Sequence, residues 1–370
     1  MLRGALRLVA GTATLAIGGW VLRALHGTPA ALGATPGAIR AVAERSPHYR
    51  EGVFRNSDPV SVLQLNREEQ RFVLRQLVFG RAASRPPAPI PLAEPALSGD
   101  SAPLAVSWLG HATTLVELDG YRVLTDPVWS ERCSPSDVVG PQRLHPPPVP
   151  LDSLPALDAI VISHDHYDHL DIDTVVALAR SQRAPFVVPL GVGAHLRAWG
   201  IAEQRIVELD WNESARIGEL NLTCTPARHF SGRFLSRNST LWASWVLAGP
   251  DNRVYFAGDT GYTRGFAEIG SRYGPFDLTL MPIGAYSAAW PDVHMNPPQA
   301  VQAHLDVNGA APGLLVPIHW CTFRLAPHPW AEPVEQLLAA AGDAGVQVAV
   351  PKPGQRVCAQ TGTDLDPWWR

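Results

Sequence analysis

The fold of this chain is decided by the stretch Ser163-His-Asp-His-Tyr-Asp-His-Leu-Asp171. It follows an apolar run, residues 158–163, that predicts a buried strand. Four of its residues form the pattern H-x-H-x-D-H: His164, His166, Asp168 and His169. Imidazole and carboxylate groups are costly to bury together without partners, and both are ligands that zinc accepts. The pattern therefore predicts a metal site; the alternative is a solvated polar loop after the strand.

The spacing of this motif indicates that one loop serves two neighbouring metals. The first two histidines are two residues apart in an extended segment, so their side chains point to the same side. The aspartate and the third histidine come after the chain has turned, and they are expected to face the second metal. A helix is expected over residues 172–183, with Asp171 or Asp173 as its N-cap. Asp165 is expected to turn away and to make a hydrogen bond within the loop.

Further candidate ligands lie at the ends of three apolar runs, residues 220–229, 253–261 and 313–319. Each one alone is a weak signal, because a single histidine after a strand is more often structural. Together they indicate a site, since functional residues tend to lie on loops held by a rigid scaffold. The three candidates are His229, Asp259 and His319.

The order of these motifs resembles the metal signature of the metallo-β-lactamase superfamily, over about residues 102–358. Within this superfamily, the chain most specifically resembles the family of N-acyl-phosphatidylethanolamine-hydrolysing phospholipases D. The motifs that carry this closer resemblance are WLGHATT (108–114), TDPVWS (125–130), SHDHYDHLD (163–171), GDTGY (258–262), IGAY (283–286) and HWCTF (319–323). Two further stretches, residues 46–56 and 237–244, are similar to the same family.

The resemblance implies a dinuclear zinc centre with an open position for substrate. The ligands that it implies for the first zinc are His164, His166 and His229. Those for the second zinc are Asp168, His169 and His319. Asp259 would bridge the two ions, together with a water or hydroxide.

Three more residues match motifs of the family without being its metal ligands. His111 and Asp126 are expected to hydrogen-bond the ligands and orient them, and the alternative is that they only stabilise their loops. His294 lies where the family has a pocket histidine. It is expected either to bind the substrate phosphate, to protonate the leaving group, or to have a purely structural role. Asp259 and His294 are thus the candidate catalytic residues, whereas His304 is expected to be an ordinary surface or packing residue.

The implied activity is a metal-dependent hydrolase, a phosphodiesterase of phospholipase D type. Hydroxide, available because zinc lowers the pKa of bound water to about 7, would attack the phosphorus of N-acyl-phosphatidylethanolamine or a related phospholipid. The products would be phosphatidic acid and N-acylethanolamine. One alternative is a lactonase or another phosphodiesterase on the same fold, because one fold supports many reactions. The second alternative is a non-catalytic zinc-binding membrane protein.

The predicted fold class is α/β, because strand runs alternate with helical stretches such as 298–307 and 331–344. The resemblance implies a four-layer αββα sandwich. The expected divisions are a hydrophobic anchor or signal segment (1–27), an extension with a Pro-rich linker (28–100), the catalytic domain (101–358) and a C-terminal tail (359–370). Within the extension, residues 67–79 have the apolar spacing of a helix.

Residues 8–22 form an uncharged, largely apolar run between arginines. Its length suits a signal-peptide core and falls short of the ~20 residues that a spanning helix needs. The segment is thus borderline between the two; we expect it to be an uncleaved or interfacial membrane anchor, and the second choice is an exported or periplasmic protein. The expected partners are a phospholipid substrate and a membrane surface, and the sequence leaves oligomerisation open.

The charge balance argues against a nucleic-acid partner. The net charge is −4 and the isoelectric point about 6.3, and no cluster of Lys and Arg marks a phosphate-tracking groove. The four cysteines lie far apart without a C-x-x-C pair, so a disulfide framework is not expected.

Overall fold

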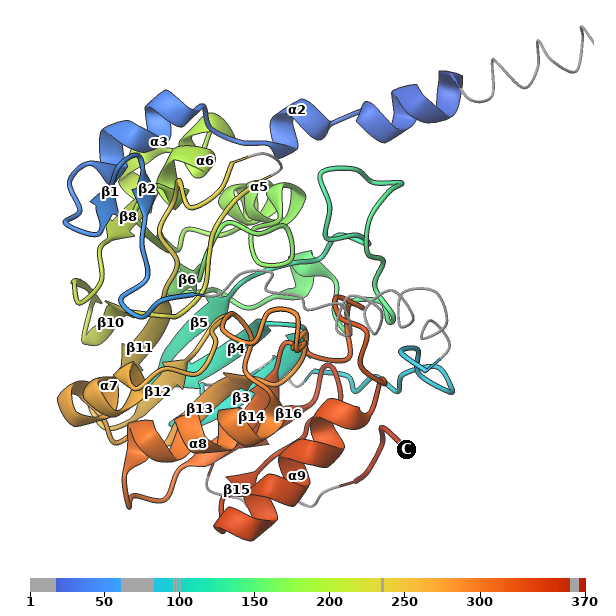
Figure 1. Cartoon of the computed structure of the whole chain (residues 1–370), viewed down its shortest axis with the longest axis vertical. Coiled ribbons are helices and arrows are strands. Elements are labelled where there is room, and N and C mark those ends of the chain that lie inside the picture. Colours follow the sequence, from blue (N-terminus) through green and yellow to red (C-terminus); the bar gives the residue numbers. More distant parts are fainter. Residues whose placement is uncertain are drawn as a thin grey trace, which may run out of the picture.

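The computed structural model describes residues 18–60, 83–95, 97, 99, 101–233, 236–359 and 366–370. Two seven-stranded sheets lie face to face, with helices on the outer face of each (Figure 1). This confirms the predicted α/β class and the layered sandwich of two sheets between helices. Residues 1–17, with most of the predicted anchor, and the predicted helix at 67–79 lie outside the described residues. The predicted domain divisions stay predictions.

The first sheet is half antiparallel and half parallel. Strands β16 to β5 pair antiparallel, and β5 to β8 pair parallel. Its strands in spatial order are β16 (Arg356–Cys358), β3 (Leu104–Gly110), β4 (Thr113–Leu118), β5 (Tyr121–Thr125), β6 (Ala159–Val161), β7 (Phe186–Pro189) and β8 (Ile206–Leu209).

The second sheet repeats this arrangement. Strands β9 to β12 pair antiparallel, and β12 to β15 pair parallel. Its strands in spatial order are β15 (Gln347–Val348), β14 (Leu314–Ile318), β13 (Leu278–Pro282), β12 (Arg253–Phe256), β11 (Ser244–Ala248), β10 (Leu220–Thr225) and β9 (Ser214–Ile217).

The helices cover both outer faces, and the N-terminal extension adds a small hairpin (Figure 1). On the side of the first sheet lie α3 (Pro36–Ala43), α5 (Ile172–Ser181) and α6 (Val192–Ala198), and on the side of the second lie α7 (Gly265–Tyr273), α8 (Pro297–Asn308) and α9 (Glu332–Ala344). The remaining elements are α2 (Thr28–Ala31), the hairpin β1 (Tyr49–Arg50) and β2 (Val53–Phe54), and the 3-10 turns Leu151–Ser153 and Glu203–Arg205. The helix predicted over 172–183 is confirmed as α5, with Asp171 as its N-cap.

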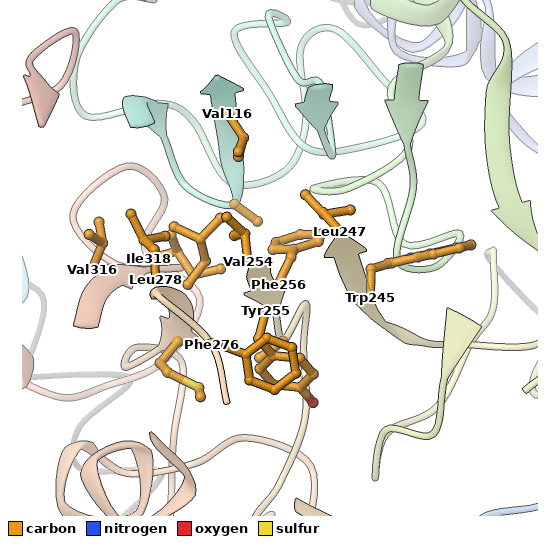
Figure 2. Close-up of a cluster of buried hydrophobic side chains, with 14 of the residues drawn as sticks. Val116, Trp245, Leu247, Val254, Tyr255, Phe256, Phe276, Leu278, Val316 and Ile318 are labelled. Atoms are coloured by element: carbon orange, nitrogen blue, oxygen red, sulfur yellow. The ribbon is translucent and has the colours of Figure 1, made fainter. Parts of the chain in front are cut away.

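The alternation of side chains along the strands builds two apolar layers. In β4, Val116 faces the layer between the sheets, whereas Leu115 faces the layer under α5 and α6. Figure 2 shows the inter-sheet layer, where Val116 of the first sheet points toward Val254 and Phe256 of the second. Tyr255, one residue along, points to the opposite side and lies beside Phe276, with ring centroids 5.3 Å apart. Both sheets are therefore buried on both faces.

The part of the chain that the structure describes contains no helix long and apolar enough to cross a bilayer. Residues 18–25 form a helix with exposed apolar side chains, among them Trp20, Leu22 and Leu25. All four cysteines are free thiols, and Cys224 is buried in β10.

Candidate metal centre

The candidate ligands meet because the strands that precede them point the same way. In the first sheet β3, β5 and β6 run in one direction, as β10, β12 and β14 do in the second. The carboxyl ends of such strands share one edge, where ligands bind in α/β proteins. The residues that follow these strand ends are His111, Asp126 and His164 from the first sheet, and His229, Asp259 and His319 from the second.

The ligand atoms of the candidates gather into groups in which they all lie within 4.8 Å of one another. One group is His164, His166 and His229, the set expected for the first zinc. Another is His111, Asp168, His169 and His319, which contains the set expected for the second. The remaining two groups share Asp259, and they add His164 and His169 or His229 and His294.

Asp259 lies between these two sets. Its Oδ1 is 3.0 Å from Nε2 of His319, and its Oδ2 is 3.1 Å from Nε2 of His169 and 3.8 Å from Nε2 of His229. Asp168 Oδ2 is 3.4 Å from Nε2 of both His169 and His319. The position of Asp259 matches the bridging role that the resemblance implies.

The buried polar atoms of this cluster fit a bound cation. Nε2 of His169, His229 and His319 and Oδ1 of Asp259 are buried, and none of their contacts, including the 3.0 Å between Asp259 Oδ1 and His319 Nε2, has the geometry of a hydrogen bond. Unsatisfied buried polar atoms are costly, so a native structure rarely collects several at one place without a ligand. Imidazole nitrogens and carboxylate oxygens are a donor set that zinc accepts. The residues therefore fit a dinuclear metal site, and the identity of the metal as zinc stays a prediction.

The other nitrogen of two of these rings is already engaged, which fixes the orientation of the ring. His229 Nδ1 donates to the carbonyl of Val293 at 2.8 Å, so its Nε2 carries the lone pair. His169 Nδ1 contacts Oδ2 of the fully buried Asp126 at 2.6 Å. Asp126 also accepts from the backbone N–H and the hydroxyl of Ser163, both at 2.6 Å. The predicted orienting role of Asp126 thus rests on observed contacts.

His111 lies beside the second set of ligands. Its Nε2 is 2.9 Å from Oδ2 of Asp168, and its backbone N–H donates to the Thr322 hydroxyl at 2.7 Å. Three residues at this edge adopt a positive φ, a conformation that costs side-chain-bearing residues roughly 1–3 kcal/mol. They are His111 (55°), Asp126 (33°) and His319 (60°). Such strain is typical of functional sites, where the surrounding structure holds it in place.

Without a metal, protons on neighbouring histidines balance the negative charge of the carboxylates in the cluster. Burial raises the pKa of Asp168 and Asp259, but the neighbouring histidines, His169 foremost, together outweigh this for both, so each pKa lies well below its usual range. Burial lowers the pKa of His319, but Asp259 and Asp168 outweigh it and raise that pKa to about 9. Burial, aided by other histidines, holds the pKa of His164 well below its usual range. The buried carboxylates are therefore stabilised by positive charge beside them, and a divalent cation would supply that charge.

A family described as a Beta-lactamase superfamily domain matches residues 121–320, more than half of the chain. The chain belongs to the metallo-β-lactamase superfamily. The matched stretch includes every candidate ligand implied by the resemblance. The family predicted from the sequence is confirmed.

Three similar proteins show how the chain sits in the superfamily. An uncharacterized protein of Mycobacterium tuberculosis is 69% identical over the full length of both chains. The N-acyl-phosphatidylethanolamine-hydrolyzing phospholipase D 1 of Caenorhabditis elegans is 41% identical over 60% of this chain and 65% of its own. Igni18, a metallo hydrolase of Ignicoccus hospitalis, matches with a TM-score of 0.52 and 24% identity over 69% of this chain and 97% of its own, which shows the fold.

His294 lies in the loop between β13 and α8, at the sheet edge that carries the candidate ligands. Its Nδ1 is 3.9 Å from Oδ2 of Asp259 and is buried without a hydrogen-bond partner. Burial lowers the pKa of His294 to about 4, so the ring is neutral near pH 7. Two residues later Asn296 begins α8 with a capping box to Gln299, which fixes the end of the loop. A neutral His294 suits a hydrogen bond to substrate better than proton donation.

Asp165 turns away from the metal centre, as predicted. It is fully buried and accepts from the backbone N–H of Gly232 at 2.7 Å. Nε2 of His195 lies 3.3 Å from the other carboxylate oxygen. Since His195 Nδ1 accepts from the N–H of Ala34 at 2.9 Å, Nε2 carries the proton. A histidine outside the ligand motifs thus ties the N-terminal extension to the metal loop.

Arg233 makes a second tie between the same segments, and nothing in its sequence context indicated it. Its guanidinium donates to the carbonyls of Asp165 at 2.7 Å, Leu170 at 3.0 Å and Ala31 at 2.8 Å. The buried cation also lies over the ring of Tyr167 at 4.0 Å. It therefore holds both ends of the H-x-H-x-D-H loop.

Asn56, the last residue of the stretch 46–56, is a further residue near the site to which the sequence assigned no role. Its Nδ2 donates to the carbonyl of His229 at 2.7 Å, and its Oδ1 accepts from the N–H of the same residue at 3.0 Å. Oδ1 also accepts from Nε1 of Trp242 at 3.1 Å. The extension therefore clamps the backbone of a candidate ligand. His304, in contrast, is a buried packing residue that contacts the Thr279 hydroxyl at 2.8 Å.

Substitution of Asn56 by alanine is expected to weaken metal binding about tenfold, because residues that orient ligands typically contribute 10–100-fold to metal affinity. Asn56→Asp should also weaken it, since a carboxylate cannot donate to the His229 carbonyl. The measurement is a zinc titration against a competing chelator. Asn221→Ala, in the strand that leads to His229, is the matched control. Equal affinities for Asn56→Ala and the control would refute the clamp.

Proposed function

We propose that this metal-dependent hydrolase is a zinc-dependent phosphodiesterase of phospholipase D type. The substrate would be N-acyl-phosphatidylethanolamine or a related phospholipid, and the products phosphatidic acid and N-acylethanolamine. The observation that carries the proposal is the pair of ligand groups joined through Asp259. The 41% identity to the worm phospholipase D over 60% of this chain supports the substrate class.

In the proposed mechanism, residues of this chain hold the metal ions, contact the substrate phosphate and keep the metal ligands in place. Two bound zinc ions would lower the pKa of water and stabilise the charge that develops on the substrate phosphate. His164, His166 and His229 would hold one ion, Asp168, His169 and His319 the other, and Asp259 both. His294, neutral and with a free ring nitrogen at the same edge, would hydrogen-bond a phosphate oxygen. Asp126 and His111 would keep the ligands in place.

Association with a membrane is part of the same proposal. A phospholipid substrate is presented at a bilayer surface, and the helix at residues 18–25 exposes Trp20, Leu22 and Leu25. Aromatic and aliphatic side chains of this kind favour the interfacial layer of a bilayer. The apolar run 8–22 would contribute to the same contact.

A substrate panel tests the proposal. Zinc-loaded protein is incubated with N-acyl-phosphatidylethanolamine, phosphatidylcholine, an acyl-homoserine lactone and a generic phosphodiester. We expect release of N-acylethanolamine and phosphatidic acid, detected by mass spectrometry, and none of it from His169→Ala. Opening of the lactone with the phospholipids untouched would make the chain a lactonase instead. Zinc binding without turnover of any substrate would favour a non-catalytic role.

A further inference from the structure

A short N-terminal segment, residues 28–34, is hydrogen-bonded to buried side chains of the catalytic fold, and we call it the strap. The carbonyl of Ala31 accepts from Nε of Arg233 at 2.8 Å. The N–H of Ala34 donates to Nδ1 of His195 at 2.9 Å. The strap therefore supplies one acceptor and one donor to side chains that lie 202 and 161 positions further along the chain.

Both of these side chains also hold the residue that separates two candidate ligands. Asp165 lies between His164 and His166 in the chain. Its carboxylate is 3.3 Å from Nε2 of His195, and its carbonyl accepts from Nη1 of Arg233 at 2.7 Å. The strap is thus one side chain away from Asp165 by two separate routes.

The side chains along these routes have little freedom to adjust. His195, Asp165 and Arg233 are all buried, and both ring nitrogens of His195 are engaged. The Arg233 guanidinium also donates at 3.0 Å to the carbonyl of Leu170, the residue after the candidate ligand His169. Because closely packed interiors transmit displacements instead of absorbing them, a shift of the strap would move the loop that carries the ligands.

Gly33 shows how closely the strap lies against His195. Its φ is +80°, and a Cβ at this position would lie 2.1 Å from Nδ1 of His195. Gly27, the N-cap of α2, has nearly the same φ, +77°, but a Cβ there would meet nothing within 4 Å. The two glycines therefore share a backbone conformation that strains other residues, and they differ in what a side chain would contact.

We propose that the strap positions the H-x-H-x-D-H loop for metal binding, acting through His195 and Arg233. No strap residue is a candidate ligand, so its role is positioning. The proposal rests on the metal-binding part of the proposed function and not on the substrate. The helix at residues 18–25 precedes the strap and extends away from the sandwich (Figure 1). The strap therefore also connects the proposed bilayer contact to the metal loop.

The test measures metal binding by the full-length protein. Zinc is titrated against a competing chelator, and the absorption spectrum of the cobalt-substituted protein reports the geometry of the ligands. Gly33→Ala pushes the strap off His195, whereas Gly27→Ala is the matched control, with the same strain and no new contact. Trp199→Phe keeps an aromatic ring but removes the Nε1–H that donates to the carbonyl of Ala30 in the strap at 2.8 Å. Thermal unfolding verifies that each variant is folded.

We expect Gly33→Ala to weaken zinc binding by about tenfold or more and to change the cobalt spectrum, because residues that orient ligands typically contribute 10–100-fold to metal affinity. Trp199→Phe should weaken binding by up to about fivefold, the typical net contribution of one hydrogen bond. Gly27→Ala should match the wild type.

Equal zinc affinities and cobalt spectra for Gly33→Ala and Gly27→Ala overturn the proposal, even if Gly33→Ala unfolds at a lower temperature. If Gly33→Ala does not fold, wild-type affinity and spectrum in Trp199→Phe overturn it. A wild-type protein that binds no metal refutes the metal centre and the role of the strap together. The expected order of affinities without turnover of any phospholipid would support the strap and contradict only the proposed substrate.

Discussion

Replacement of Asp259 by asparagine is expected to reduce hydrolysis by about 10³-fold or more. The carboxylate lies within 3.8 Å of Nε2 of His169, His229 and His319, so it is placed to contact both metals. An amide of the same shape keeps the packing but removes the negative charge that holds two cations together. Metal ions contribute several kcal/mol to stabilising the charge of the transition state, which corresponds to about 10³-fold or more in rate.

The prediction for Asp259→Asn is checked by the rate of N-acylethanolamine release and by metal content from elemental analysis. We expect less than two zinc ions per chain in the variant. Asp343→Asn, an exposed carboxylate in α9, is the isosteric control and should keep full rate and metal content. Near-wild-type rate and metal content in Asp259→Asn would contradict the bridging role.

Removal of the metals is expected to abolish turnover and to make stability depend on pH. Although burial opposes it, Asp259 and Asp168 raise the pKa of His319 to about 9 in the metal-free protein, above its usual value of 6.5. A raised pKa stabilises the fold fully below pH 6.5, and this contribution is lost as the pH rises through 9. The free energy of unfolding of the metal-free protein should therefore fall between pH 6.5 and 9. The slope is up to about 1.4 kcal/mol per pH unit for each extra proton that the folded state holds.

The zinc-reloaded protein is the control for this measurement. Bound metal takes the place of the protons on His319 and His169, so its unfolding free energy should change much less over the same range. Urea unfolding at several pH values, with and without chelator, gives both curves. The same slope for the metal-free and the reloaded protein would mean that the carboxylates of the cluster are not balanced in this way.

The spacing of residues along the chain predicted the ligand set because each candidate is local to a strand end. His164 and His166 follow β6, His229 follows β10, and His319 follows β14, as the apolar runs before them indicated. The succession of strand runs and helical stretches predicted the α/β class, whereas the two-sheet sandwich was implied by the family resemblance. The boundaries of the elements were less well predicted. The expected helix over 172–183 ends at Ser181, because Gln182 adopts an extended conformation as its C-cap.

The sequence by itself determined the α/β class and the candidate ligands, since these depend on the type and spacing of nearby residues, and its motifs carried the resemblance that implied the superfamily and the layered fold. Only the tertiary structure decided what surrounds them. Asn56 clamps His229 across 173 positions of the chain, and Arg233 reaches Ala31 across 202. Contacts of this kind have no local period, and they arise only when the packing of the two sheets brings distant loops to one edge.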